Sequence, residues 1–296
     1  MASTLPRTIF ITATDTGVGK TLLTALLYLH LKSQGHRVLA IKPFCCGGRN
    51  DAELFHALQC ISGPVRGRSV VKMKRAFSAG VGLDDRKPRA LPWAGRKDAF
   101  GVADAAKLTI DQINPFYLPE PVAPLVAARK HRRTITFEDL LDYVQGIQYW
   151  LRDTRDARDA RDPSNPPTLL IEGAGGLLAP LGPGYSALDI ISCLQCQCTV
   201  ISPNRLGTLN HTLLTIRALQ AAGIQDVSVS LNDSTSPNRD QSCRSNPAIL
   251  KELLAPRLVI QIPFLGDRPL KFEVLERSAK RLDKQLGKLL ATARQS

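Results

Sequence analysis

The segment that most constrains this chain lies near its start, where an apolar strand pattern runs directly into a glycine-containing loop and then into an apolar helical pattern. The strand pattern covers residues 7–13, the loop ends in Gly17-Val18-Gly19-Lys20-Thr21, and the helical pattern covers residues 20–34. A loop in this context points backbone N–H groups and a helix dipole at an anion, as a phosphate-binding loop does. An ordinary glycine-containing turn is the simpler alternative.

The remaining chain alternates short β-branched runs with amphipathic helical patterns, which predicts a parallel sheet covered by helices. Several runs are continuously apolar, as strands buried on both faces are. We therefore expect an α/β fold, a P-loop NTPase-like three-layer sandwich with a mainly parallel central sheet flanked by helices. Strands are expected at residues 7–13, 37–42, 168–172, 198–202, 227–231 and 258–262, and helices at residues 20–34, 51–59, 120–130, 137–153, 187–195, 209–221, 247–254 and 272–293.

Residues 1–296 are expected to form a single P-loop domain whose pattern is interrupted twice. Residues 62–112 are rich in Gly, Pro, Lys and Arg with weak periodicity, which predicts a basic, loop-like surface insertion that is partly disordered. Residues 152–162 repeat Arg and Asp every three residues, which predicts a charged helix extension with i,i+4 ion pairs. The prolines at 163–167 are expected to end it.

The formal net charge of +13 at first suggests a nucleic-acid partner. Between Pro64 and Asp98, however, ten Lys/Arg stand against three Asp, so this one segment supplies +7. Because the charge is concentrated in the insertion, we expect no nucleic-acid partner.

No apolar run approaches the roughly 18–20 residues that span a bilayer, so no membrane association is expected. About seven residues precede the first apolar segment, which is too short for a secretory signal. Seven cysteines, an odd number, argue against a disulfide framework, and Cys193, Cys196 and Cys198 are expected to be buried thiols rather than a metal cluster. We expect a cytoplasmic protein.

Two carboxylates and a second lysine are candidates to complete a site around the loop. Glu172 ends a predicted strand and precedes a glycine-rich turn, so its carboxylate is expected in the crevice where such sheets bind ligands. Asp51 begins a predicted helix, where it is either a metal ligand or an N-cap. Lys42 closes the second strand, which is costly for a charged residue unless it faces a phosphate or a substrate.

Taken in order, the motifs resemble those of dethiobiotin synthetases, and the resemblance covers most of residues 7–61, 113–151 and 168–265. The chain departs from the family pattern in places: Ala13 stands where the family has Gly, Gly17 where it often has Glu and Cys46 where it has Ser. The 62–112 insertion is also longer than the family's usual connection. The matching segments are Ile11–Thr21, Lys42-Pro43 with Cys45-Cys46-Gly47, Asn50-Asp51-Ala52, Asn114-Pro115-Phe116, Glu120–Pro124, Glu172–Gly176, Leu206–His211 and Asn232-Asp233.

The resemblance implies an ATP-dependent cyclo-ligase that converts 7,8-diaminopelargonate, CO₂ and ATP into dethiobiotin, ADP and phosphate. One amine captures CO₂ as a carbamate, ATP phosphorylates the carbamate, and the second amine closes the ring. Lys20 and Lys42 are the implied catalytic residues, and Thr21, Asp51 and Glu172 the implied Mg²⁺ ligands. The implied ATP-binding residues are Asp15, Thr16, Gly17, Val18, Gly19, Lys20, Thr21, Asp51, Glu172, Gly173, Ala174, Gly175, Asn232 and Pro263.

The same resemblance implies a homodimer with the active site at its interface. The implied substrate-binding residues are Thr16, Lys42, Cys46, Gly207, Thr208, Leu209 and Asn210, the last four contributed by the neighbouring subunit.

Two other functions stay open on the sequence. One is a nucleotide-switched P-loop ATPase of the DNA-partitioning type, although the additional Lys that such loops carry near their start is absent here. The other is a different P-loop amide-forming synthetase; those that carry a glutaminase domain need more chain than the about 30 residues that follow residue 265.

Overall fold

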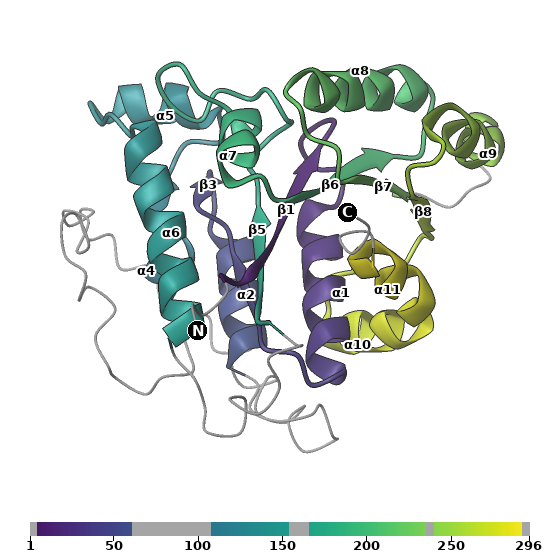
Figure 1. Ribbon diagram of the computed structural model, residues 1–296, viewed down its shortest axis with the longest axis horizontal. Helices are drawn as coiled ribbons and strands as arrows, with labels where there is room; N and C mark the ends of the chain where they lie inside the picture. The colour runs from purple at the N-terminus through teal and green to yellow at the C-terminus, as the bar shows by residue number, and fades with distance from the viewer. Residues whose placement is uncertain (1–4, 61–107, 154–165, 235–239, 292–296) are drawn as a thin grey trace.

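The computed structural model describes residues 5–60, 108–153, 166–234 and 240–291, which fold around a six-stranded parallel sheet with the order β2-β5-β1-β6-β7-β8 (Figure 1). Every neighbouring pair of strands is parallel. The predicted α/β class with a parallel central sheet is therefore confirmed. The strands are β1 (Arg7–Ala13), β2 (Val38–Ile41), β5 (Thr168–Glu172), β6 (Gln197–Pro203), β7 (Val227–Asn232) and β8 (Val259–Ile262).

Helices cover both faces of the sheet, which completes three layers (Figure 1). On one face α1 packs against α2, α10 and α11. On the other lie α6, α7 and α8, with α9 along β8 at the sheet edge. The bounds are α1 (Lys20–Ser33), α2 (Asn50–Gln59), α6 (Phe137–Asp153), α7 (Ala187–Leu194), α8 (Thr208–Ala221), α9 (Ser242–Leu254), α10 (Phe272–Arg281) and α11 (Asp283–Ala291).

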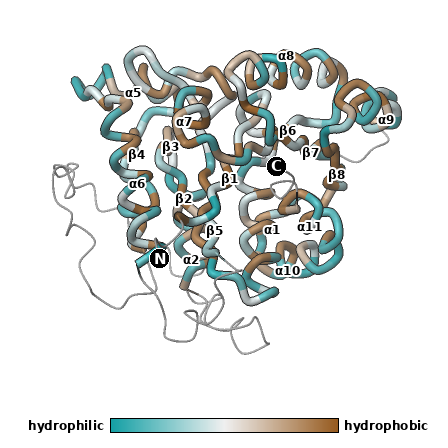
Figure 2. Tube along the Cα trace, viewed as in Figure 1, coloured by the Kyte–Doolittle hydropathy of each residue, from teal (hydrophilic) through white to brown (hydrophobic). Residues whose placement is uncertain are grey.

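The core lies between these layers, and the central strands are mainly apolar (Figure 2). All seven residues of β6 and all five of β5 are buried, as expected for strands covered on both faces. The register pairs Ile11 of β1 with Glu172 of β5, and Ile41 of β2 with Ile171 of β5. The residue after β2, Lys42, therefore emerges beside Glu172.

A second, two-stranded parallel sheet was not predicted. It is formed by β3 (Phe44–Cys46) and β4 (Phe116–Leu118), which pair Phe44 with Phe116 and Cys46 with Leu118. Each strand has only three residues, too few for a periodic pattern to show in the sequence. The two phenylalanine rings stack at 4.9 Å.

Three predicted helices differ from the structure. The helix expected at 120–130 is α5 (Pro124–Lys130), with a proline at its first position. The helix expected at 247–254 begins at Ser242 and contains Pro247. Proline leaves the Cys243 carbonyl without its helical donor, and Asn204 Nδ2 donates to that carbonyl instead, at 3.0 Å. The helix expected at 272–293 divides into α10 and α11 at Leu282.

The predicted insertion at 62–112 ends earlier than expected. Leu108 is buried, and α4 (Ile110–Ile113) is closed by a reciprocal capping box between Thr109 and Gln112. Residues 61–107 lie outside the described part of the chain, as do residues 154–165, which include most of the predicted charged extension. Within the described ranges, no helix is long and apolar enough to cross a membrane.

Candidate active site

A cavity of about 1000 Å³ opens at the carboxyl ends of the central strands. One side is formed by the loop between β1 and α1, and another by the turn after β5. This is the edge of an open parallel sheet where ligands bind. The lining residues are Thr16–Leu22, Lys42, Phe44, Cys46, Asp51, Pro121–Pro124, Glu172, Ala174–Gly176, Ala179, Asn232–Ser234, Phe264–Asp267, Pro269 and Leu270.

The loop between β1 and α1 has the backbone geometry of an anion cradle. Gly17 and Gly19 have φ angles of +73° and +100°, which L side chains rarely adopt. A Cβ at Gly19 would also lie 2.7 Å from Asn232 Nδ2, so only glycine fits there. This loop leads into the first turn of α1 and lines the cavity, as expected of a phosphate-binding loop.

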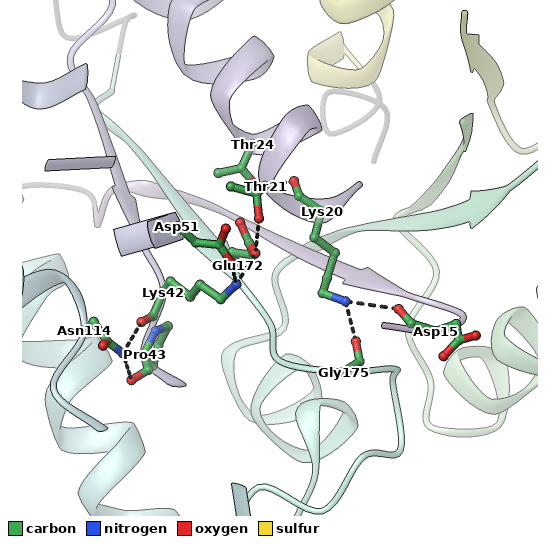
Figure 3. Close-up of polar contacts among 10 residues, drawn as sticks. All are labelled: Asp15, Lys20, Thr21, Thr24, Lys42, Pro43, Asp51, Asn114, Glu172 and Gly175. Carbon is green, nitrogen blue, oxygen red and sulfur yellow. Dashed lines mark hydrogen bonds and ion pairs between the residues drawn. The ribbon is translucent and has the colours of Figure 1, made fainter. Parts of the chain in front are cut away.

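Lys20, the first residue of α1, lies in the cavity wall and connects the loop after β1 with the turn after β5. Its Nζ donates to the carbonyl of Asp15 at 3.1 Å and to that of Gly175 at 2.7 Å (Figure 3). Burial lowers its pKa to about 8, although Glu172 opposes that shift. Among the described residues, the ammonium donates only to these neutral carbonyls, at a point where an anionic ligand would stabilise its charge.

Glu172 is the centre of the polar cluster in Figure 3. Its Oε1 accepts hydrogen bonds from Thr21 Oγ1 at 2.9 Å and from Lys42 Nζ at 2.8 Å. Lys42 Nζ also pairs with Asp51 Oδ2. Lys42 is 9% exposed and Glu172 1%, so these charges are almost out of contact with water.

The charge states of Lys42 and Glu172 depend on the contacts between them and with Asp51. Burial by itself lowers the pKa of Lys42, but the carboxylates of Glu172 and Asp51 outweigh it and the net shift is upward. Burial raises the pKa of Glu172, and Lys42 opposes that rise. Lys42 is therefore a fixed cation at the site.

The oxygen atoms of this cluster suit a hard divalent cation. Glu172 Oε2 is buried and has no hydrogen-bond partner among the described residues. The Thr21 hydroxyl and the Asp51 carboxylate lie around the same carboxylate. Carboxylate and hydroxyl oxygens are the ligands that Mg²⁺ prefers. Asp51 is not an N-cap, since α2 begins at Asn50 and Arg49 occupies the cap position, so that alternative is wrong.

The structure brings most of the predicted site residues to this one cavity. Cys46, half-buried at the end of β3, lies on its wall, and burial raises the pKa of its thiol to about 11. Thirteen predicted residues line the cavity: Thr16, Gly17, Val18, Gly19, Lys20, Thr21, Lys42, Cys46, Asp51, Glu172, Ala174, Gly175 and Asn232.

Other predicted residues do not line it. Asp15 contributes its carbonyl to Lys20 and its carboxylate to the Thr16 N–H without lining the cavity. Gly173 packs against Phe10, and Pro263 lies just before the lining segment that starts at Phe264. The turn at Gly207, Thr208, Leu209 and Asn210 is also outside this chain's cavity, at the start of α8.

The predicted site residues leave out most of two walls of the cavity. One is the loop from Pro121 to Pro124, which matches the family pattern but has no predicted site role; the other is the segment from Phe264 to Leu270, where only the neighbouring Pro263 is predicted. The second wall follows the carboxyl end of β8, where the other strands also end at the site. The first depends on the unpredicted β3–β4 pairing, which brings Pro121 against Gly47.

Comparisons with known proteins bear on this site. The AAA_26 family model, an AAA domain, matches residues 7–84 and 94–268. This chain belongs to the AAA_26 family. Except for Pro269 and Leu270, the cavity lining lies within the matched region, from the loop after β1 to the segment after β8.

Relatives of this AAA_26 chain include ATP-dependent dethiobiotin synthetases (BioD). It is 27% identical to the enzyme of Bacillus licheniformis over 261 residues, covering 88% of this chain and 84% of that one. It is 28% identical to that of an Anaeromyxobacter species over 246 residues, 82% and 83% of the two chains. Among solved structures, a plasmid partition protein of Borrelia burgdorferi bound to AMPPNP superimposes with a TM-score of 0.52 at 14% identity, covering 97% and 98% of the two chains. This similarity is one of fold, and the predicted P-loop NTPase-like class is confirmed.

Proposed function

We propose that this AAA_26 protein is an ATP- and Mg²⁺-dependent dethiobiotin synthase that closes the ureido ring of 7,8-diaminopelargonate with CO₂. The observation that carries the proposal is the cluster of Lys42, Asp51 and Glu172 beside Lys20 and Thr21 of the phosphate loop. The relatives named dethiobiotin synthetase support it. The similarity to the partition protein is one of fold alone and does not favour a DNA-partitioning ATPase.

The reaction asks the protein mainly to position reactants and to neutralise negative charge. One amine of the substrate adds to CO₂ and forms a carbamate. A carbamate oxygen attacks the γ-phosphorus of ATP, and ADP leaves. The second amine then attacks the carbamoyl carbon, phosphate leaves, and the ring closes. In-line phosphoryl transfer of this kind depends on positioning and electrostatics more than on covalent help.

Lys20 and Lys42 divide the electrostatic task. Lys20 lies within the phosphate loop, where its ammonium would bind the β- and γ-phosphate oxygens once a nucleotide displaces its carbonyl contacts. Lys42 lies on the opposite side of Glu172, toward Cys46 and the β3 wall, where it would face the carbamate and the γ-phosphoryl group. Fixed cations aimed at developing negative charge lower the barrier without reorganisation.

Thr21, Asp51 and Glu172 would hold Mg²⁺ in this proposal. The ion would neutralise charge on the phosphate oxygens of ATP. Lys42 donates to both carboxylates, so its ammonium offsets one of their two negative charges.

The nucleotide would occupy the cavity from the phosphate loop toward Asn232, with Asp15, Thr16, Gly17, Val18, Gly173, Ala174, Gly175 and Pro263 as its further proposed contacts. The Asn232 side chain is 4% exposed, and its Nδ2 donates to the Val18 carbonyl at 3.2 Å. This contact fixes the amide at the cavity wall, where it would recognise adenine.

We also propose a homodimer. The turn at Gly207, Thr208, Leu209 and Asn210 begins α8 outside this chain's cavity, so binding of the substrate carboxylate there requires a second subunit. Leu206 and Leu214 beside it are 81% and 56% exposed in the single chain. Exposed apolar side chains here support the proposal that a second subunit covers this part of α8. Thr16 and Cys46 would contact the substrate from the cavity side.

Growth of a biotin auxotroph that lacks the synthetase tests the proposed function in a cell. We expect expression of this chain to restore growth without biotin, and growth on dethiobiotin to be the positive control. A strain that grows on dethiobiotin but not with the expressed, soluble chain would contradict the proposal.

A further inference from the structure

Arg49, which directly precedes α2, is bound closely by the segment around α4 and β4. Its Nε donates to Asn114 Oδ1 at 3.1 Å, and its Nη2 donates to the carbonyls of Asn114 and Ile110 at 3.0 and 3.2 Å. Its Nη1 pairs with Asp111 at 2.8 Å, and the guanidinium lies 5.1 Å from the ring centroid of Tyr117. A planar guanidinium with this many fixed partners holds its backbone at a defined place.

Asn114, which binds the Arg49 side chain, also binds the main chain next to the site. It is 1% exposed, and its Nδ2 donates to the carbonyls of both Lys42 and Pro43 at 3.0 Å (Figure 3). The Lys42 N–H donates to the Ile113 carbonyl at 3.1 Å. Because β2 ends at Ile41, the main chain of Lys42 is bound by this segment and not by the six-stranded sheet.

We infer that Arg49 and Asn114 are positioning residues, which together set the distance between Lys42 and Asp51 at the site. Asn114 holds the main chain of Lys42. Asn114 also binds the side chain of Arg49, which lies two positions before Asp51. Neither side chain touches the cavity, so neither is a catalytic residue. The inference rests on the proposed function of Lys42 and Asp51.

The contacts could also serve packing alone, and the chain offers a matched comparison. Gln59 is likewise a buried amide, and its Nε2 donates to two main-chain carbonyls, those of Ala40 and Phe55, at 3.0 and 2.9 Å. It joins α2 to β2 at a distance from the cavity lining. A packing role predicts equal effects of substitution at Asn114 and Gln59, whereas a positioning role predicts unequal ones.

The experiment compares Asn114→Asp with Gln59→Glu in the full chain. Each change replaces an amide that donates to carbonyls with a carboxylate that cannot. For Asn114→Asp we expect kcat for ring closure to fall about tenfold or more while the Kd for ATP changes less than threefold. For Gln59→Glu we expect both constants within twofold, measured well below either unfolding midpoint. Equal kcat for the two variants would overturn the inference.

A second readout does not depend on turnover. Acetylation of lysines by an N-hydroxysuccinimide ester, followed by peptide mass spectrometry, reports how well each ammonium is protected. In Asn114→Asp we expect acetylation of Lys42 relative to Lys20 to rise about fivefold, because only Lys42 is released. A rise in both lysines together, or in neither, would overturn the inference.

The two readouts separate this inference from the proposed function. A wild-type protein without diaminopelargonate-dependent turnover would remove the proposed function, and the Lys42 to Lys20 ratio would still decide the positioning role. If Asn114→Asp does not fold, Arg49→Lys replaces it, since Arg49 is partly exposed and lysine cannot reproduce the forked contacts. An Arg49→Lys variant with unchanged kcat and unchanged Lys42 protection would contradict the inference.

Discussion

Lys42 Nζ and Glu172 Oε1 lie 2.8 Å apart, and the pairing of β2 with β5 explains why. Ile41 and Ile171 are register partners, so the residues that follow them, Lys42 and Glu172, lie side by side at the same edge of the sheet. Both side chains are almost fully buried, and Thr21 and Asp51 complete their contacts. A cation and two carboxylates are therefore held together in a medium where their charges are weakly screened.

Replacing Glu172 with Gln tests the importance of that carboxylate. The amide keeps the shape but loses the charge that faces Lys42 and would bind the metal. We expect turnover to fall about 100-fold or more, as for removal of other preorganised charges from active sites. Phosphate release under single-turnover conditions measures the effect. Glu276→Gln, on α10, is the control and should stay within twofold; a similar result for Glu172→Gln would refute its role.

Replacing Lys42 with Gln should separate binding from ring closure. The phosphate loop and Lys20 remain, so we expect an ATP analogue to bind with an affinity within about tenfold of wild type. We expect ring closure to be nearly abolished, by about 100-fold or more, because the charge facing the carbamate is lost. Lys20→Gln should instead lose most of the affinity. Calorimetry with the analogue and an assay of ADP release give the two quantities, and near-normal turnover of Lys42→Gln would remove it from the mechanism.

Alanine substitutions at Gly19 and Gly35 distinguish the effect of backbone strain from the effect of damage to the nucleotide site. Both have left-handed φ angles, +100° and +82°, so alanine strains either by about 1 kcal/mol. A Cβ at Gly19 would also meet Asn232 Nδ2 at 2.7 Å, whereas Gly35 has nothing within 4 Å. We expect Gly19→Ala to weaken nucleotide binding at least about tenfold. We expect Gly35→Ala to lower only the free energy of unfolding, and equal binding by the two variants would contradict this.

The buried His30 of α1 predicts a pH dependence of stability. Burial lowers its pKa below 6.5, although Asp283, 3.0 Å from its Nδ1, opposes the shift. As the pH falls through about 6.5, the unfolded chain takes up a proton that the folded chain refuses, so the free energy of unfolding decreases. His30→Gln should flatten this decrease, whereas His211→Gln, at an exposed position on α8, should not. Urea unfolding between pH 7.5 and 5.5 measures the difference, and parallel curves for wild type and His30→Gln would refute it.

Local pattern was enough to predict the parts of the molecule that are regular or glycine-dependent. The strand at Arg7–Ala13, the helix at Phe137–Asp153 and the loop between Gly17 and Thr21 are where the sequence predicts them. The sheet order was beyond the sequence, because nothing in β2 or β5 alone specifies that they are neighbours. The contact of Lys42 with Glu172 is a consequence of that order.

Features that depend on tertiary partners were not predictable. Pro247 is a helix breaker by its own chemistry, and it lies inside α9 because Asn204, distant in sequence, satisfies the freed carbonyl. Arg49 belongs to no recognised motif, and the Asn114-Pro115-Phe116 match does not say what Asn114 contacts; their connection across 65 positions of sequence becomes visible only in the fold.

The most direct test of the proposed function is the release of ADP by the purified protein with each substrate left out in turn. We predict that ADP release requires both 7,8-diaminopelargonate and CO₂ supplied as bicarbonate, and that one dethiobiotin forms for each ADP. ADP release that is independent of diaminopelargonate and is stimulated by DNA would contradict it.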